Sequence, residues 1–201
     1  MSTPVATVPL ALDDYVPVLL AGVGALWLAR STARPPAVFG ALLVLVGGLC
    51  KATWKLLLAA SGHDVPLLDD LLFAFLAPGF ALLTWGLLRR AVPLAAPLSL
   101  SAVAAVAAAL TASPAPLLVL AVVGATATGV LALLRARQGG DTVAAALFAV
   151  QLGMAYALVP LAGAAQSIAH QWWEQSLNTL GQGAFALGAW RLLHSRTRSY
   201  A

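Results

Sequence analysis

Residues 36–60 read PAVFGALLVLVGGLCKATWKLLLAA, an almost unbroken apolar run that contains both lysines of the chain, Lys51 and Lys55. A helix needs about 20 mostly apolar residues to cross a bilayer, so this run is long enough to be a transmembrane span. An ionisable side chain at membrane depth is costly unless it is paired or hydrated, and it therefore marks a functional site by default. The stretch predicts a membrane fold and the place of its site together.

The composition of the whole chain agrees with this prediction. Of 201 residues, 61% are hydrophobic and only 9% are charged, whereas a soluble domain typically has about 25% charged residues. The formal net charge is +4, but the arginines lie singly or in pairs between apolar runs, which argues against nucleic acid as a partner. We expect a multi-pass integral protein of the cytoplasmic (inner) membrane, with membrane lipids as its immediate partners.

Polar or proline-marked breaks divide the chain into seven apolar runs. The runs lack the alternating pattern of barrel strands, and hydrocarbon leaves only helices and closed barrels able to satisfy the backbone. We therefore expect an all-α integral membrane protein, a single membrane domain over residues 1–201 with seven transmembrane helices. The expected spans are residues 15–30, 36–60, 66–88, 93–112, 115–134, 142–164 and 171–193.

The arginines lie in alternate connections between these runs and at the C-terminus, which places all of them on one side of the membrane. Positively charged residues favour the cytoplasmic side, so we expect the N-terminus outside and the C-terminus in the cytoplasm. The acidic residues, Asp141 excepted, fall on the opposite side. The arginines concerned are Arg30, Arg34, Arg89, Arg90, Arg135, Arg137, Arg191, Arg196 and Arg198.

An internal repeat is visible when the chain is displaced by 105 residues, because residues 80–89, FALLTWGLLR, then match residues 185–194, FALGAWRLLH, at six of ten positions. We interpret residues 15–90 and 115–195 as two three-helix repeats joined by a connector helix at 93–112. Convergent helix ends rich in Leu, Ala and Trp would give a similar match. Because the connector restores the starting side, the halves run in the same direction, as in parallel transporter repeats. This 3+1+3 architecture resembles that of the SWEET proteins in span count and symmetry only.

Seven spans also occur in the microbial rhodopsins, which carry retinal on a lysine of the last helix. The run 171–193 contains no lysine, so a retinal Schiff base in that position is excluded. We expect no cofactor.

The two lysines are four residues apart and share one face of a helix, with Trp54 beside them. At a rise of 1.5 Å per residue, both lie in the outer half of their span. The next span carries Asp69 and Asp70 near its outer end, so we expect Lys55 to pair with one of them. Lys51 lies deeper and is expected to reach the last span or a ligand. Long lysine side chains can also extend to the membrane interface, which would make the pair structural.

Polar side chains recur along one face of the last span, and in lipid such a stripe must face protein or a water-filled cavity. We expect it to form a polar cavity in the outer half of the bilayer, together with the lysines. Interhelical hydrogen bonding or a homodimer seam would also account for it. The span 142–164 adds Gln151 and Tyr156 to this cavity, and the repeat offset places Tyr156 opposite Lys51. The stripe comprises Gln171, Gln175, Asn178 and Gln182, with Glu174 on its edge.

Two histidines, His63 and His170, lie near outer turns and close in sequence to acidic residues. Imidazole and carboxylate groups can hold a metal ion, but the spacing here matches no established motif. We treat both histidines as weak candidates and predict no metal site.

These features favour a protein that binds or transports a small solute through the polar cavity. Lys51 would hold an anionic group of the solute, and Asp69 or Glu174 would exchange protons if transport is proton-coupled. Alternatively, the charged set is a fold-specifying network in a non-catalytic scaffold or accessory subunit, which would have a second copy or another membrane protein as partner. A membrane enzyme acting on lipid at the outer surface would use Asp69, Asp70 or Glu174 as a base. No catalytic constellation is visible, so a non-enzymatic role is favoured.

Overall fold

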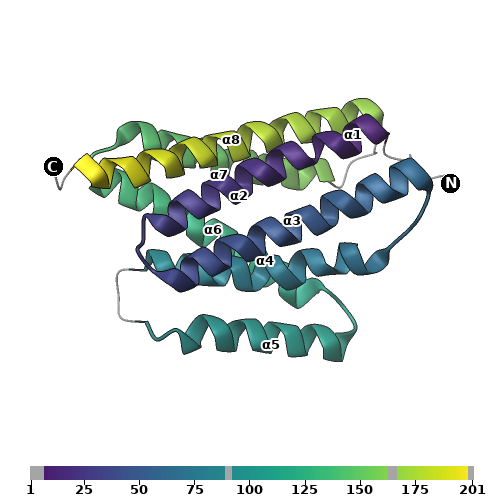
Figure 1. Ribbon diagram of the computed structural model, residues 1–201, viewed down its shortest axis with the longest axis horizontal. Helices are drawn as coiled ribbons and strands as arrows, with labels where there is room; N and C mark the ends of the chain where they lie inside the picture. The colour runs from purple at the N-terminus through teal and green to yellow at the C-terminus, as the bar shows by residue number, and fades with distance from the viewer. Residues whose placement is uncertain (1–6, 89–91, 163–166, 199–201) are drawn as a thin grey trace.

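The computed structural model describes residues 7–88, 92–162 and 167–198, without the side chains of 161, 162 and 196–198. Arg89 and Arg90 therefore lie outside the described residues. Every regular element within the described ranges is a helix (Figure 1). The helices are α1 (Val8–Asp13), α2 (Tyr15–Arg30), α3 (Pro35–Ser61), α4 (Pro66–Leu87), α5 (Ala95–Thr111), α6 (Ala115–Gln138), α7 (Thr142–Ala162) and α8 (Ile168–Arg198).

Five helical segments are long and apolar enough to cross a membrane, as expected of an integral membrane protein. They are Val8–Arg30, Pro35–Ser61, Pro66–Leu87, Ala115–Gln138 and Thr142–Pro160. The other two expected spans correspond to α5, which is apolar but has only 17 residues, and to α8, which has 31 residues and carries the polar stripe. In this coarser form, an all-helical membrane fold, the prediction is confirmed for the described part of the chain.

The first helical segment begins earlier than the sequence predicted. α1 continues into α2 because the amide of Asp14 donates to the carbonyls of Leu10 and Leu12. Pro9 lies in the first turn of α1, where a helix needs no amide donor. Asp13 and Asp14, which precede the expected span 15–30, therefore lie within the continuous segment Val8–Arg30.

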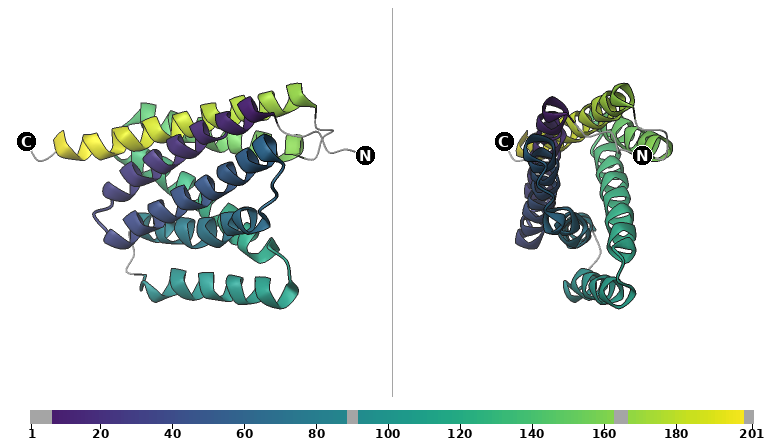
Figure 2. Two further views of the ribbon diagram at one scale, coloured as in Figure 1. Left: turned by 45° about the vertical axis from the view of Figure 1, so that its right-hand side comes forward. Right: turned by 90° about the vertical axis from the view of Figure 1, so that its right-hand side faces the viewer.

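Six helices pack in a closed ring. Neighbours around the ring are α2, α3, α4, α6, α7 and α8, and α8 returns to contact α2. α5 contacts α4 and α6 and lies outside the ring, as the right-hand view of Figure 2 shows. The order of contacts is the same within α2–α4 as within α6–α8, and the α4–α6 and α8–α2 contacts join the two groups.

A glycine pair brings α3 and α4 into close contact. A Cβ added to Gly40 would lie 2.7 Å from Gly79 O, and one added to Gly79 would lie 2.9 Å from Gly40 O. Backbone atoms cannot move aside as a flexible side chain can, so both positions require glycine. Small residues of this kind let helices approach closely where lipid offers no hydrophobic driving force.

The two contacts between the helix groups are built alike. Phe80 of α4 lies against Gly124 of α6, and Phe185 of α8 lies against Gly24 of α2. In each case a phenylalanine from the third helix of one group meets a glycine from the first helix of the other. The two groups are therefore joined by reciprocal contacts.

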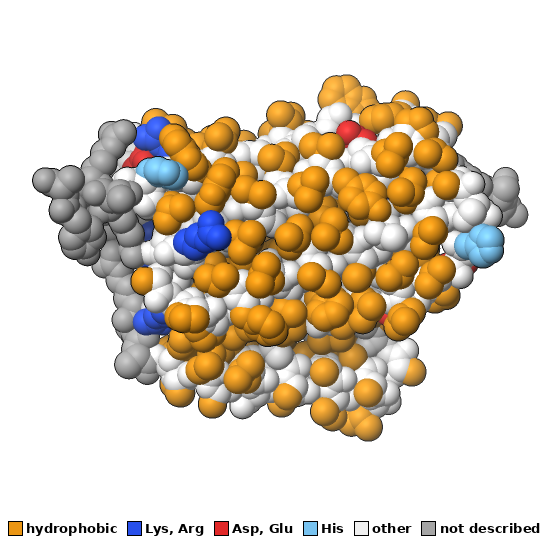
Figure 3. All heavy atoms as spheres, in the orientation of Figure 1, with side chains coloured by type: hydrophobic (Ala, Val, Ile, Leu, Met, Phe, Trp, Pro, Cys, Tyr) orange, Lys and Arg blue, Asp and Glu red, His pale blue; other side chains and the backbone are white. Residues whose placement is uncertain are grey.

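The charged side chains mark two different ends of the ring. We call the arginine end the end at the left in Figures 1 and 3, where Arg34, Arg135 and Arg191 lie near helix termini. The lysine end is the opposite one, toward which Lys51 and Lys55 lie on α3. Between the ends, hydrophobic side chains cover the face seen in Figure 3. Exposed apolar surface of this extent is typical of contact with lipid.

A tightly packed core cluster fills the arginine half of the ring. Its largest fully buried members include Leu28, Leu83, Leu87 and Phe148, from α2, α4 and α7. The rings of Phe148 and Phe185 meet edge to face with centroids 6.0 Å apart. This packing closes the arginine half of the ring.

Replacing Gly79 by alanine tests the close α3–α4 contact. We expect Gly79→Ala to lower the free energy of unfolding by about 1–3 kcal/mol, because the new methyl group forces the two helices apart. Gly153→Ala is the matched control, since a Cβ at Gly153 meets nothing within 4 Å, and it should leave stability unchanged or slightly raised. The measurement is unfolding by SDS in mixed micelles, followed by circular dichroism. Equal effects of the two substitutions would contradict the close contact.

Candidate functional site

The deeper lysine is bound within its own helix pair. Lys51 Nζ forms an ion pair with Asp69 at the start of α4, and it also lies 4.2 Å from the centre of the Trp54 ring. In Figure 1, α4 begins farther from the lysine end than α3 ends, and the start of α4 carries the Asp69 that pairs with Lys51. The prediction that Lys51 lies too deep for α4 is wrong, because it assumed that the two helices meet at the same level.

The outer lysine pairs with the first helical segment. Lys55 Nζ lies 2.7 Å from Asp14 Oδ2, and nearby Tyr15 Oη and Thr53 Oγ1 share a hydrogen bond of 3.0 Å. The prediction that Lys55 pairs with Asp69 or Asp70 is therefore wrong. Its cause is the early start of the first helix, which places Asp14 beside α3.

The other candidate residues at the lysine end come from α3, α4, α8 and the connection between α3 and α4. Asp70 is exposed, and Trp54 Nε1 donates to Asp64 at 2.9 Å. His170 Nε2 lies 3.3 Å from Glu174 Oε1 on the same helix, while His63 bonds to Ser61. Within the described residues, no group of three or more His, Cys, Asp or Glu side chains could hold a metal ion.

A cavity of about 300 Å³ lies at the centre of the six-helix ring and is lined by residues from all six helices. Its depth is intermediate, because the lining residues lie away from the ends of the helical segments, the first of which runs from Val8 to Arg30. The wall formed by α2, α3 and α4 comprises Pro17, Val18, Ala21, Ala25, Val44, Gly48, Leu72, Leu76 and Phe80. The wall formed by α6, α7 and α8 comprises Ala125, Thr128, Gln151, Ala155, Asn178, Gln182 and Phe185.

The two walls differ in chemistry. The α2–α4 wall offers no side-chain hydrogen-bonding group among the lining residues, whereas the α6–α8 wall offers three amides and one hydroxyl. Gln182 Nε2 donates to Asn178 Oδ1 at 3.4 Å, and Thr128 Oγ1 shares a 3.0 Å hydrogen bond with Thr84 Oγ1. Gln151 Oε1 is buried and has no hydrogen-bond partner in the described part of the chain.

The polar stripe of α8 faces the inside of the ring. Asn178 and Gln182 line the cavity, and Gln175, one turn nearer the lysine end, is buried with a relative exposure of 7%. Gln175 Nε2 and Thr179 Oγ1 are also buried without a partner among the described residues. The predicted direction of the stripe thus agrees with the structure, and it leads from the cavity toward the lysine end.

The lining differs from the predicted site in several residues. Asn178 and Gln182 are among the predicted site residues that line the cavity, while Lys51 and Lys55 do not. Tyr156 is 54% exposed on the outer face of α7 and shares a 2.9 Å hydrogen bond with Thr126. The repeat offset aligns positions in sequence, and it could not show which way the side chain points.

Gln151, which the sequence indicated as part of the cavity because an amide within an apolar run must face inward, does line it. Other lining residues were missed by sequence reasoning. Phe80 and Phe185 stood at matching positions of the repeat, and the structure puts both on the cavity wall. The apolar lining of α2 and α3 has no signal of its own, because alanine and valine are abundant in every run.

The arginine end is held by hydrogen bonds between helices. Arg34 Nη1 donates to Trp85 O at 3.0 Å, and Arg135 Nη2 donates to Leu87 O at 2.6 Å. Cationic side chains are favourable beside such helix C-termini. These bonds join α3 to α4 and α4 to α6.

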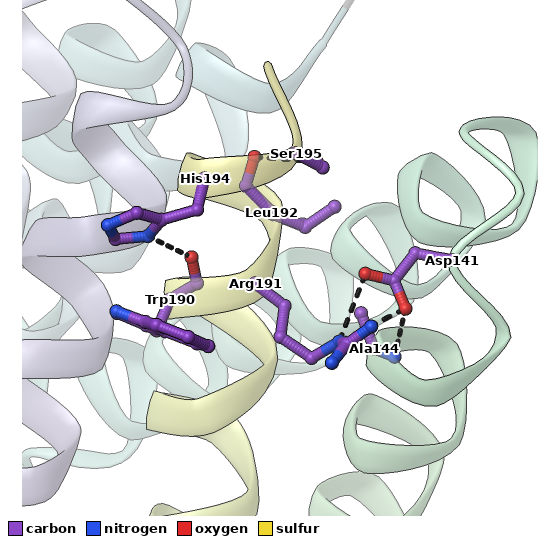
Figure 4. Close-up of polar contacts among 7 residues, drawn as sticks. All are labelled: Asp141, Ala144, Trp190, Arg191, Leu192, His194 and Ser195. Atoms are coloured by element: carbon purple, nitrogen blue, oxygen red, sulfur yellow. Dashed lines mark hydrogen bonds and ion pairs between the residues drawn. The ribbon is translucent and has the colours of Figure 1, made fainter. Parts of the chain in front are cut away.

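An ion pair holds α7 to α8 at the same end (Figure 4). Arg191 Nε lies 3.1 Å and 3.2 Å from the two carboxylate oxygens of Asp141, and Asp141 Oδ1 accepts from Ala144 N at 2.9 Å, which caps α7. Burial favours the neutral acid, but the hydrogen bond from the Ala144 amide, the hydrogen bond and charge of Arg191 and the Val143 amide outweigh it, and together they hold the pKa of Asp141 below its usual value.

No protein-family model, no curated protein and no solved structure matches the chain. The chemistry of the cavity and of its surroundings is therefore the basis for a proposed function.

The charge of Asp141 gives the fold a pH dependence. A lowered pKa in the folded state stabilises the protein above the pKa of the unfolded chain, and this contribution is lost as pH falls through the folded value. At pH 7 we expect Asp141→Asn to lower the free energy of unfolding by about 1 kcal/mol. The difference from wild type should shrink as pH falls below about 4.

SDS unfolding in mixed micelles at several pH values checks this expectation. Asp70→Asn, the same change at an exposed position, is the matched control. Its free energy of unfolding at pH 7 should stay within about 0.5 kcal/mol of the wild-type value. A pH-independent effect of Asp141→Asn would show that the charge of Asp141 does not stabilise the fold.

Proposed function

We propose that this chain is an integral membrane carrier that binds a small solute in the central cavity. The observation that carries the proposal is a cavity to which all six ring helices contribute, with amide groups on one wall. Ligand sites are typically concave, mostly apolar and equipped with a few polar groups that fix orientation, and they occur between the helices of bundles. The cavity has all of these properties.

The proposed topology has seven spans with the arginine end in the cytoplasm. Arg30, Arg34, Arg135, Arg137 and Arg191 support this orientation by the positive-inside rule. At 1.5 Å per residue, the 17 residues of α5 reach about 25 Å, a length that a locally thinned bilayer can accommodate. The cytoplasmic membrane is part of the proposal.

The outward face of α8 supports its place as the last span. Trp173, Leu180 and Leu187 are 69%, 61% and 56% exposed, and they recur at intervals of seven residues, so they form one apolar face. The amides of the same helix face the ring interior. A helix that is polar inside and apolar outside suits a wall between lipid and a solute cavity.

The proposed carrier moves by rocking α2–α4 against α6–α8 as parallel repeats. The equal order of packing in the two groups supports this, and so do the reciprocal contacts of Phe80 with Gly124 and of Phe185 with Gly24. The core cluster closes the arginine half, so the described state would admit solute from the lysine end. Proton coupling is not part of the proposal, because no acidic or histidine side chain lines the described cavity.

The lysine pairs have a structural role in this proposal. Lys51 bonds to Asp69 and Lys55 to Asp14, so each charge is balanced within the α1–α4 group. These pairs would keep that group rigid as it moves. The same pairs are compatible with the runner-up function, a non-catalytic scaffold or accessory subunit, which would use α5 and its exposed apolar side chains to contact a partner.

Filling the cavity tests the carrier. Ala21 lines it, so Ala21→Leu should remove the space for a solute, whereas Ala157→Leu adds the same volume on an exposed face of α7. We expect vesicles with the wild-type protein to take up at least one of tritiated glycerol, glucose and uridine faster than protein-free vesicles. Ala21→Leu should reduce that uptake about tenfold or more, because ligand and leucine cannot occupy one site, and Ala157→Leu should leave it unchanged.

Two results would contradict the carrier. Uptake equal to that of protein-free vesicles for all three solutes would reject transport of this class of compound. Equal uptake by the Ala21→Leu and wild-type proteins would place the pathway outside the cavity. Circular dichroism and monodispersity of both variants confirm that any loss is not a loss of folding.

A further inference from the structure

The distribution of polar groups in the cavity points to a class of ligand, an inference that rests on the proposed function of the cavity. We infer that the cavity takes a small, uncharged, two-sided molecule. Its apolar side would lie on the α2–α4 wall, and its other side would carry both a hydrogen-bond donor and an acceptor toward Gln151, Asn178 and Gln182.

Charge is excluded by the lining. None of the described lining residues is acidic, basic or histidine, and transfer of an isolated ion into such surroundings is strongly unfavourable. The nearest lysine, Lys51, lies one turn from the lining residue Gly48, but its charge is balanced by Asp69. An anionic group held by Lys51, as the sequence suggested, would have to displace that carboxylate.

The amide groups require a ligand that both donates and accepts. Each amide has one carbonyl oxygen and one NH2 group, so Gln151, Asn178 and Gln182 offer acceptors and donors side by side. Within this set, the Gln182 NH2 group donates to the Asn178 carbonyl oxygen in a long hydrogen bond. Gln151 Oε1 is buried close to Gly129 of α6 and lacks a donor among the described residues, so the Gln151 side chain has to turn toward the cavity for a ligand to supply one.

The α2–α4 wall determines what the rest of the ligand must be like. Val18, Val44, Leu72, Leu76 and Phe80 present aliphatic and aromatic carbon, which binds apolar surface without directional demands. The cavity of about 300 Å³ is at the lower end of the range for ligand sites. A compact ring or short chain with one amide-like end therefore fits both its size and its polarity.

Fluorine NMR on the full-length protein in lipid nanodiscs tests this class directly. The probes are 4-fluorobenzamide, which is neutral and both donates and accepts, 4-fluorobenzoate, 4-fluorobenzylammonium and the apolar 4-fluorotoluene. Binding is the line broadening by wild type minus that by Ala21→Leu, which removes partition into lipid. We expect 4-fluorobenzamide to bind at least fivefold more tightly than either ion, because an ion would lose its hydration in the cavity.

Replacing Gln151 identifies the polar contact. We expect Gln151→Leu to weaken the binding of 4-fluorobenzamide by about three- to tenfold, the effect of one lost hydrogen bond. The binding of 4-fluorotoluene should be unchanged. Gln171→Leu, the same change outside the described lining, should alter neither. The thermal unfolding midpoint of Gln151→Leu should not fall, because the substitution removes a buried oxygen that lacks a donor. If Gln151 only stabilised the fold, its replacement would lower this midpoint.

The outcomes separate this inference from the proposed function. If Ala21→Leu reduces the line broadening of none of the probes, the cavity is rejected as a binding site, and the ligand class with it. Two results would overturn the ligand class alone, with broadening still dependent on the cavity. In one, an ion binds as tightly as 4-fluorobenzamide; in the other, Gln151→Leu does not weaken the binding of 4-fluorobenzamide. Amide preference that depends on Gln151 supports both the proposed function and the ligand class.

Discussion

The structure depends on one constraint, which is that polar side chains within hydrocarbon must face protein or water. Gln151, Asn178 and Gln182 belong to helices whose outer faces are apolar, so their amides can only point into the ring. Apolar residues on α2–α4 complete the wall opposite them. A space with one polar and one apolar wall follows from this arrangement, and close glycine contacts hold the helices in place around it.

The two helix groups have similar frames but different chemistry. Packing order and the reciprocal phenylalanine–glycine contacts are shared between α2–α4 and α6–α8. Both lysines belong to the first group, where Lys51 and Lys55 are paired, and the cavity amides belong to the second. An asymmetric ligand would therefore bind in one orientation, with its polar side toward α6–α8.

The sequence predicted the helices well because their signal is local. Apolar runs, prolines and arginines set the limits of most helices to within a few residues, and the spacing of Gln175, Asn178 and Gln182 correctly indicated an inward face. The pairing of Lys55 could not be predicted, because it depends on the early start of the first helix at Val8 and on the displacement of α4 relative to α3. Both depend on how the helices pack against one another, which cannot be predicted from any single apolar run. The cavity was predicted too near the lysines for the same reason.

The central claim is that the ring encloses a space that water and solute can reach, and cysteine accessibility tests it most directly. Cys50, the single cysteine of the chain, is first replaced by alanine, and then Ala125 on the cavity wall or Val103 on the outer face of α5 is replaced by cysteine. The proteins are reconstituted in vesicles and exposed to a membrane-impermeant methanethiosulfonate. The cavity predicts rapid modification at position 125 and slow modification at position 103, which faces lipid. Equally slow modification at both positions would contradict a solute-accessible cavity.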